Sequence, residues 1–378
     1  MELSKIREEI DSVDKQITEL FEARMKLALE VAKSKLETGN QVFDKERELQ
    51  KLDAVCALLK DPQNEQGLRE LFSQLMLISR KKQYKFISRE NSAMFSKCRF
   101  VPHIETGNKR IVYQGLEGAY SQVATVEYFG KDCDCFSVTT WRDAMDALNE
   151  NRADYAVLPI ENSSAGSVEE NYDLIAEYDH HIIGEIVLGI DHVLVGIPGA
   201  KLEDINTVYS HYQALAQCSG FTQSNHFSTI PLKNTAVAAK KIKDDSDKTH
   251  AAIANRLTAE IYGLDIISEN ICNSNTNQTR FIIVGRDETY EERANKISIC
   301  VELIHESGSL YHVLSNFIFN NLNMTHIESR PIAGRNWEYR FFIDFTGNLR
   351  DESVQNALLG VTEESKYIKV LGNYHSSI

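Results

Sequence analysis

The first 88 residues of the chain contain almost no glycine or proline, and their apolar residues recur at helical spacing. This pattern predicts three helices, at roughly residues 2–37, 45–60 and 65–87. A first helix of about 35 residues carries an apolar stripe that two shorter helices cannot cover. The segment therefore predicts a helical dimer in which the long helices of two chains exchange partners.

The stripe on the first helix also contains charged residues. Its apolar members, which share one face at about 3.6 residues per turn, are Ile6, Ile10, Val13, Ile17, Leu20, Leu27 and Val31. Arg24 and Lys35 fall inside the same stripe, where a charge is costly unless it is paired. On the second helix Glu48 shares a face with apolar residues, and on the third Ser79 and Gln83 do so. Each alone is explained by a structural ion pair or a snorkelling side chain, but together they predict a pocket.

Arg7 lies at the edge of this stripe, about 25 Å along a straight helix from Arg24. One small ligand cannot contact both residues from a single helix, so a shared site requires Arg7 from a second chain. The runs IREEIDSVDKQITELFEARMKLALEVAKSK, FDKERE and ISRKKQ resemble the all-helical chorismate mutase family. The resemblance implies a reaction without a cofactor or covalent intermediate, and site residues Arg7, Arg24, Lys35, Asp44, Arg47, Glu48, Ser79 and Gln83.

The chemistry that this resemblance implies suits those residues. An intramolecular Claisen rearrangement requires the substrate in its reactive conformer and donors where charge grows on the breaking ether oxygen. Arg24 and Arg47 are expected to bind carboxylates, and Lys35 and Gln83 to face the ether oxygen. If Glu48 shares that oxygen, it must be protonated in order to donate a hydrogen bond.

Residues 110–285 alternate short β-rich runs with helical patterns, which predicts an α/β domain with largely parallel sheets. Polar residues follow several strand ends, where open α/β sheets bind ligands. They include the ENSS run at 161–164, the Ser210–His211 pair and the QTR run that precedes the apolar FIIV. Each could be a turn or a helix cap. The segment has no G-x-G-x-x-G or G-x-S-x-G motif, which argues against a dinucleotide site and a hydrolase triad.

The motifs GxxGxYS, PIENS, SHxQxLxQC, IYGL and NxTRF follow one another in this segment and together resemble the prephenate dehydratase family. The resemblance implies two α/β lobes, similar to periplasmic binding proteins, with the site in the cleft between them. The implied site residues are Glu161, Asn162, Ser210, Gln217, Thr279, Arg280 and Phe281.

The implied dehydratase reaction expels the ring hydroxyl and releases the ring carboxylate as CO2. Hydroxide is a poor leaving group, so a positioned proton donor is the largest available help. We expect Thr279 to hydrogen-bond the departing oxygen, with the proton supplied directly or through Glu161 or water. Arg280 is expected to bind a substrate carboxylate bidentately, and Phe281 to shape the wall.

The pattern from residue 296 to residue 378 is strand, helix, strand, strand, helix, strand, which predicts a ferredoxin-like fold. ESGSLYHVL and IESRPIAGRNWEY resemble the amino-acid-binding ACT domain. The resemblance implies a regulatory site for L-phenylalanine at Gly308, Ser309, Leu310, Glu328, Ser329, Arg330 and Pro331. Ser309 stands where that family has alanine. The alternative is a passive oligomerisation module.

The formal net charge of −14 makes nucleic acid and anionic membranes poor partners for the whole chain. The charged, helical N-terminus is unlike a signal peptide or membrane anchor, and seven scattered cysteines fit reduced thiols. We therefore expect a cytoplasmic protein. Cys133 and Cys135 have no second pair nearby, so no metal site is predicted, and no cofactor is expected.

Together these patterns predict a multidomain protein: a helical domain (1–88), a linker (89–109), a two-lobed α/β domain (110–285) and an ACT domain (296–378). The resemblance implies a bifunctional enzyme that converts chorismate to prephenate and prephenate to phenylpyruvate. Feedback inhibition by L-phenylalanine and an assembly of at least two chains are implied as well. Two alternatives are an anion or amino-acid sensor that has lost catalysis, and an arogenate dehydratase.

Overall fold

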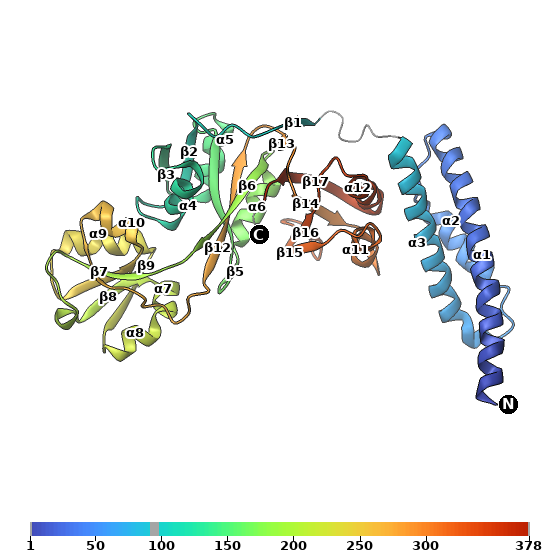
Figure 1. The fold of residues 1–378 in the computed structure, drawn as a ribbon, viewed down its shortest axis with the longest axis horizontal. Helices are drawn as coiled ribbons and strands as arrows, with labels where there is room; N and C mark the ends of the chain where they lie inside the picture. The colour runs from blue at the N-terminus through green and yellow to red at the C-terminus, as the bar shows by residue number, and fades with distance from the viewer. Residues whose placement is uncertain (1, 91–97, 377–378) are drawn as a thin grey trace. The chain divides into compact units, whose positions relative to one another are not determined.

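The computed structural model describes residues 2–90 and 98–376. The chain forms two compact units, and each combines segments that are distant in sequence. One unit contains residues 1–98 and 299–369, and the other contains residues 99–298 and 370–378. The helical segment and most of the C-terminal segment therefore share one unit. The elements carry the labels of Figure 1.

The helical segment contains α1 (Leu3–Thr38), α2 (Lys45–Cys56) and α3 (Glu65–Glu90), with a 3₁₀ turn at Pro62–Asn64. Local sequence explains the ends of these helices. Gly39 stops α1 in a left-handed conformation (φ 71°), and the Asp44 carboxylate caps α2 by accepting from the Arg47 amide at 3.0 Å. The three predicted helices are thus present, although α2 ends earlier than expected.

The apolar stripe of α1 is exposed in one chain, which agrees with the prediction that two shorter helices cannot cover it. Within one chain α1 buries Met25, Ala28 and Ala32 and packs along α3. By contrast, Leu20 is 71% exposed and Leu27 is 67% exposed. A single chain has too little helical surface to cover both faces of α1, because only α3 runs beside it for an appreciable length.

The two larger sheets of the second unit each have helices packed on them (Figure 1). The first sheet has the order β3-β2-β4-β12-β6, and β5 also pairs with β4. Its elements are β2 (Arg110–Gln114), α4 (Tyr120–Phe129), β3 (Asp134–Val138), α5 (Trp141–Asn149), β4 (Tyr155–Asn162), β5 (Gly166–Ser167), α6 (Glu169–Glu177), β6 (His181–Gly189) and β12 (Gln278–Gly285).

The second sheet has the order β11-β7-β10-β8-β9. Its elements are β7 (Val193–Gly196), η2 (Leu202–Asp204), β8 (Thr207–His211), α7 (Tyr212–Gln217), α8 (Ser219–Ser224), β9 (Ser228–Leu232), α9 (Thr235–Asp245), β10 (His250–Ala254), α10 (Arg256–Tyr262) and β11 (Asp265–Ser268). Tightly packed small residues such as Ala238, Ala239 and Ala252 form its core.

Both sheets are mixed rather than largely parallel. β2 pairs in parallel with β3 and β4, whereas β12 is antiparallel to both β4 and β6. In the second sheet β7 is antiparallel to β10 and β11. Parallel neighbours need a crossover connection, and β12 instead enters the first sheet on the chain's return from the second. The expected parallel pattern thus holds only for strands that helices connect.

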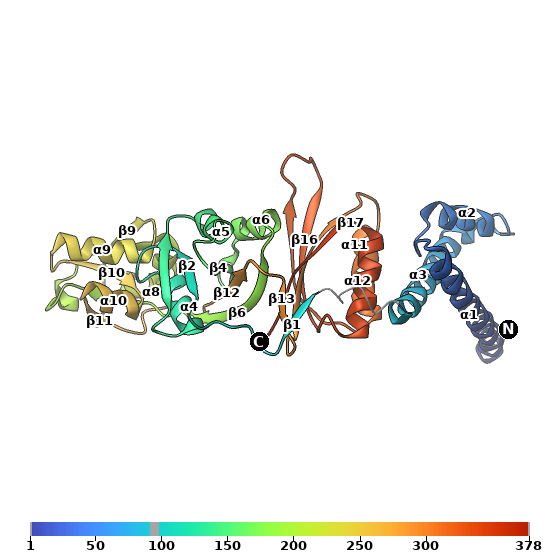
Figure 2. The same cartoon turned by 90° about the horizontal axis from the view of Figure 1, so that it is seen from above.

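The C-terminal segment contains β14 (Lys296–Leu303), α11 (Ser309–Phe319), β15 (Met324–Pro331), β16 (Tyr339–Thr346), α12 (Glu352–Glu364) and β17 (Ser365–Tyr374). The strand order is β15-β16-β14-β17, and both helices lie on one face of the sheet (Figure 2). This arrangement confirms the predicted ferredoxin-like pattern.

A short strand lies in the segment predicted as a linker. β1 (Arg99–Val101) pairs in parallel with β13 (Thr289–Glu291), which belongs to the charged stretch after β12. Residues 91–97 of the predicted linker lie outside the described residues. In the part of the chain that is described, no helix has the length and apolar character needed to cross a membrane.

Candidate functional site

Helices α1 and α3 bring Arg24 and Ser79 together. The Arg24 guanidinium donates to the Ser79 hydroxyl and, at 2.8 Å, to the carbonyl oxygen of Leu75. Burial lowers the pKa of Arg24, and the negative charge of Glu48 acts in the opposite direction. Lys35 donates to the carbonyl oxygen of Val42 at 2.7 Å, just before α2. Arg24 thus lies beside the predicted polar residue Ser79 of α3, and Lys35 lies beside the loop that precedes α2.

Gln83 is the most informative of the predicted residues on α3. Its side chain is buried, and in the described part of the chain its Oε1 atom has no hydrogen-bond partner. A buried polar atom without a partner costs free energy. An amide oxygen and nitrogen can exchange places by a flip, so this position can accept from, or donate to, a bound molecule.

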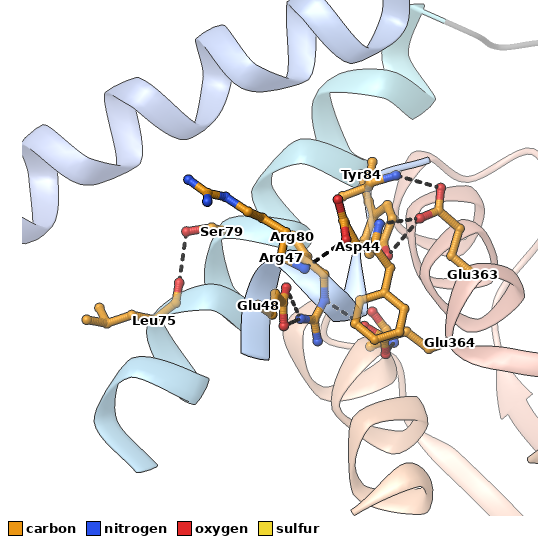
Figure 3. A network of polar contacts seen from close by, with 12 residues as sticks. Asp44, Arg47, Glu48, Leu75, Ser79, Arg80, Tyr84, Glu363 and Glu364 are labelled. Atoms are coloured by element: carbon orange, nitrogen blue, oxygen red, sulfur yellow. Dashed lines mark hydrogen bonds and ion pairs between the residues drawn. The ribbon is translucent and has the colours of Figure 1, made fainter. Parts of the chain in front are cut away.

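Figure 3 shows a residue that the sequence reasoning missed, Arg80. Its Nη1 atom lies 2.5 Å from both carboxylate oxygens of Glu48, and its Nε atom lies 3.1 Å from Oε1 of Glu364 on α12. Burial opposes the charge of Arg80, but Glu48 and Glu364 outweigh burial and raise its pKa. Both oxygens of Glu48 therefore face Arg80 as acceptors, whereas a role at the ether oxygen would require a Glu48 that donates.

Three predicted residues of the helical segment are open to solvent: Arg7, Asp44 and Arg47. The Asp44 carboxylate caps α2 by accepting a hydrogen bond from the backbone amide of Arg47. Arg7 lies near the start of α1, on the same exposed side as Ile6 and Ile10. The mutase-like residues of one chain thus form a partly open cluster, with Arg7 away from Arg24.

A cavity of about 300 Å³ lies between the two sheets of the second unit. Residues from both lobes line it: Gln114, Gly115, Ala119, Tyr120, Ser121, Pro159, Asn162, Val168, Ile190, His192, His211, Gln213, Ala214, Gln217, Lys233, Asn234, Thr235, Asn277, Thr279 and Phe281. Of the predicted dehydratase residues, Asn162, Gln217, Thr279 and Phe281 belong to this lining.

Asn162 and Thr279 lie opposite each other on β4 and β12. The Asn162 amide nitrogen donates to the Thr279 hydroxyl oxygen at 2.9 Å, while the Asn162 amide oxygen accepts from the Ser164 amide at 3.0 Å. A threonine hydroxyl carries one proton and two acceptor lone pairs. Because Asn162 uses an acceptor position, the Thr279 proton stays available for a molecule in the cavity.

Glu161 and Arg280 lie on the opposite face of the same strand pair, because neighbouring residues of a strand alternate in direction. Arg280 lies 3.4 Å from Glu161 and 3.2 Å from Glu185 on β6. The Glu185 side chain is 1% exposed and also accepts from Lys296 at 2.9 Å and from the Ser376 hydroxyl. Arg280 thus belongs to a buried charge cluster and is not part of the cavity lining.

Two other predicted residues have different surroundings. Ser210 is fully buried, and its hydroxyl donates to the Ile253 carbonyl oxygen at 2.7 Å. Gln217 connects the lobes, because its amide nitrogen donates to the Ser164 hydroxyl at 2.9 Å. Its amide oxygen lies 3.0 Å from Nε2 of His192. Gln217 thus faces the cavity and Ser210 supports the core behind it.

The sequence reasoning missed two residues of the cavity wall, His192 and Lys233. His192 contacts the Tyr120 hydroxyl at 2.8 Å, and burial lowers its pKa, which favours the neutral ring. Lys233 is the only lysine or arginine among the described residues that line the cavity. It directly precedes Asn234, which caps α9 by accepting from the Val237 amide at 2.7 Å. The LKNTAVAA run could have indicated this site, since it combines a strand end with a cap.

The two predicted regulatory motifs lie on different elements. Gly308 adopts φ 85° directly before α11, and the Ser309 hydroxyl donates to the Glu306 carbonyl oxygen at 3.0 Å. Ser309 also lines a cavity of about 190 Å³ together with Glu48 and Arg80. The run from Glu328 to Pro331 lies on the edge strand β15, with Leu310 on α11. Within one chain the Gly308 turn therefore lies beside α2 and α3.

Two family models match the sequence: Chorismate mutase type II at residues 6–84, and Prephenate dehydratase at residues 111–289. A bifunctional chorismate mutase/prephenate dehydratase of Neisseria gonorrhoeae is 33% identical over 98% of this chain and 96% of its own length. An arogenate dehydratase/prephenate dehydratase of Arabidopsis thaliana is 37% identical over 70% of this chain and 71% of its own. A solved prephenate dehydratase from Arthrobacter aurescens in complex with L-Phe has a TM-score of 0.66 and 32% identity, and covers 71% of this chain and 90% of that one.

Proposed function

The chain belongs to the bifunctional chorismate mutase/prephenate dehydratase family, and from that premise we propose how its residues carry out the two reactions. It catalyses two steps of phenylalanine biosynthesis, the rearrangement of chorismate to prephenate and the conversion of prephenate to phenylpyruvate. We place both reactions in the cytoplasm. The fused mutase supplies prephenate in the same chain, which favours this keto acid over arogenate.

In the mutase site, Arg24 and Arg47 bind the carboxylates of chorismate, and Lys35 and Gln83 face the ether oxygen. The buried, unpartnered amide atom of Gln83 is the observation that carries this assignment. Ser79 fixes Arg24, and Asp44 fixes the start of α2. Glu48 acts as a carboxylate held by Arg80, so it accepts a hydrogen bond from the ring hydroxyl of chorismate and does not donate one to the ether oxygen.

Arg7 completes the mutase site from a second copy of the chain. The exposed stripe on α1 supports this arrangement, because a run of large apolar side chains from Ile6 to Val31 stands 39–71% exposed. Packing two such stripes together buries them and carries Arg7 of one chain towards Arg24 of the other. The enzyme is therefore at least a dimer.

In the dehydratase site, the Thr279 hydroxyl donates to the ring hydroxyl of prephenate as the C–O bond breaks. The electron pair of the bond between the ring and its carboxylate completes the aromatic ring, CO2 leaves, and the departing hydroxide takes up a proton to form water. The observation that supports this assignment is the hydrogen bond from Asn162 to the Thr279 oxygen. Because the Thr279 oxygen accepts in this bond, its own proton can be donated to the substrate.

Lys233 and the first amides of α4 and α9 bind the carboxylates of prephenate. Their position on the cavity wall supports this role, because helix N-termini and a lysine both attract anions. Phe281 and Gln217 shape the remaining wall, and Ser210 supports it from the core. Arg280 and Glu161 act from behind β12 by fixing the strand that carries Thr279. This role replaces the expected direct contact of Arg280 with substrate.

The Thr279 assignment is tested by comparing Thr279→Val with Thr279→Ser, each assayed with prephenate. Valine should lower the dehydratase kcat about 100-fold, the low end for loss of a positioned proton donor, while serine retains most of it. The mutase rate of the same preparations, measured with chorismate, provides the internal control. Full dehydratase activity in the valine variant would show that another group assists the leaving oxygen.

We propose that the C-terminal segment binds L-phenylalanine and inhibits the dehydratase. The solved relative in complex with L-Phe supports this proposal, as does the Gly308 turn, which places amides at the start of α11. Ser309 and Leu310 follow that turn, and Glu328, Ser329, Arg330 and Pro331 form the second motif. Equilibrium dialysis with labelled phenylalanine tests this role, and absence of binding would contradict it.

A further inference from the structure

Arg80 is a buried cation that contacts no reacting atom in the chemistry above, where it enters only as the partner of Glu48. It is 3% exposed and follows Ser79 on α3. Its guanidinium group lies between the carboxylates of Glu48 and Glu364 (Figure 3). The central carbon of this group, Cζ, lies 4.7 Å from the centre of the Phe43 ring. A planar guanidinium fixes the relative positions of the groups that it contacts. The position of Glu48 is thus tied to that of Glu364.

The last turn of α12 contacts the mutase helices through two consecutive carboxylates. Glu364 accepts from Arg80 and, at 2.9 Å, from the Asn316 amide of α11. Glu363 accepts from the Phe43 amide at 2.8 Å and from the Tyr84 hydroxyl at 3.2 Å. Glu363 therefore holds the loop that leads into α2, and Glu364 holds the arginine that contacts α2 from the other side.

The burial of these charges makes them depend on one another. The side chains of Arg80 and Glu364 are 4% and 3% exposed, and burial raises the pKa of Glu364 while Arg80 lowers it. Removing one partner from a buried pair leaves an uncompensated charge that the structure must relieve by moving or admitting water. If Glu364 were neutral, Arg80 would keep its ion pair with Glu48 but lose the charge that holds its Nε atom.

We propose that Arg80 is a positioning residue of the mutase, which holds Glu48 in the site and is itself held by Glu364 of the C-terminal segment. A residue outside the mutase helices thereby sets the geometry of the mutase site. Arg80 acts through Glu48 and not on the reacting atoms. The inference rests on the proposed role of Glu48 in chorismate binding.

The test uses the full-length protein with Glu364→Gln, Arg80→Met and the double variant. Glu364→Gln should lower the mutase kcat/KM about tenfold, and Arg80→Met should lower it at least as much. In the Arg80→Met background, Glu364→Gln should then change the mutase kcat/KM less than twofold, because Glu364 no longer has an arginine to hold. The control is Glu352→Gln, which removes an exposed ion pair between α12 and Arg89 of α3 and should leave the rate within twofold.

Two results would overturn the inference. One is a Glu364→Gln variant as active as Glu352→Gln, and the other is an undiminished tenfold loss when Arg80 is already methionine. Far-UV circular dichroism shows whether the helices remain folded. Arg80→Lys, which keeps the charge but cannot contact both carboxylates through one plane, should lose mutase activity in a folded protein if Arg80→Met fails to fold. A Glu48→Gln variant with normal mutase activity would instead contradict the proposed role of Glu48.

Discussion

The mutase and dehydratase sites differ in how much of each site one chain contains. The dehydratase cavity is lined from both lobes of one unit, and its hydroxyls and amides already bond one another, as Asn162 does with Thr279. The mutase cluster is partly open, with Arg7 and Arg47 exposed and a buried amide atom of Gln83 unpartnered in the described residues. The first site is preorganised by its own fold, whereas the second depends on contacts that other parts of the protein supply.

This difference predicts that the two activities can be separated by mutation at places remote from either reaction. Substitutions on the exposed side of α1 or in the last turn of α12 should lower mutase activity and leave dehydratase activity unchanged. Substitutions on the face of β12 that points away from the cavity should lower dehydratase activity and leave mutase activity unchanged. Because both rates can be measured in one preparation, each activity serves as the control for the other.

The largest expected effect comes from a charge on the apolar stripe of α1. Leu20→Glu should lower mutase activity at least 100-fold, because it places a charge at the proposed contact between chains and removes the partner's Arg7. Dehydratase activity should stay within twofold. Leu58→Glu is the matched control, since Leu58 is 79% exposed and lies outside the stripe. Light scattering measures the oligomeric state. A Leu20→Glu monomer with full mutase activity would contradict the proposal that a second chain completes the mutase site.

A smaller effect is expected behind the dehydratase strand β12. Glu185→Gln removes the carboxylate that Arg280 and Lys296 share. Arg280 keeps its contact with Glu161, but the buried charge cluster behind β12 is weakened and β12 is expected to shift. We expect a dehydratase kcat about tenfold lower with mutase activity unchanged. Glu302→Gln is the control, because Glu302 is another buried glutamate, on β14, paired with Arg335 and Arg340. Equal losses of dehydratase activity in both variants would show that the loss comes from lower folding stability and not from the position of β12.

Lys233 should affect binding more than chemistry. Lys233→Met is expected to raise the dehydratase KM for prephenate about tenfold with kcat within twofold, because it removes attraction for a carboxylate that is present throughout the reaction. Steady-state kinetics with prephenate measures the split. Thr279→Val provides the contrast, since it should lower kcat more than it changes KM. A Lys233 variant with unchanged KM would show that the helix N-termini alone bind the carboxylates.

The smallest expected effect concerns pH. Burial lowers the pKa of His192 in the folded protein below its ordinary 6.5, so the unfolded chain binds the proton more readily. The contribution of the neutral ring to stability is therefore complete above about pH 6.5 and is lost as the pH falls below it. Between pH 7.5 and 5, wild type should lose roughly 2 °C more in Tm than His192→Asn. Equal losses by differential scanning calorimetry would contradict this cause.

The sequence predicted much of the architecture because its periodicities are strong. The long helices, the α/β segment and the βαββαβ order follow from apolar spacing and turn residues, whereas the division into two lobes was implied by the resemblance to the dehydratase family. The parallel character of the sheets was overestimated, because local alternation of strands and helices does not reveal that β12 returns from the second lobe to pair with β4 and β6.

The site was predicted less completely, for two physical reasons. Thr279 and Arg280 are adjacent, and the sequence reasoning placed both against substrate, although the alternation of a strand puts them on opposite faces. The opposite directions of these two side chains could have been predicted from the sequence. The contact between Arg80 and Glu364 could not, because the two residues are far apart along the chain and no local pattern relates them.

The discontinuous units have a consequence for synthesis of the chain. The first unit breaks off at Cys98 and resumes at Ile299, so its helices are made about 270 residues before Glu364. At typical elongation rates this interval is on the order of 10 to 50 s. During it Arg80 lacks Glu364 and has only the glutamate of its own helical segment, Glu48, among the two carboxylates that it contacts in the folded chain. The geometry that Glu364 imposes on the mutase helices is thus completed only when the C-terminal segment has been made.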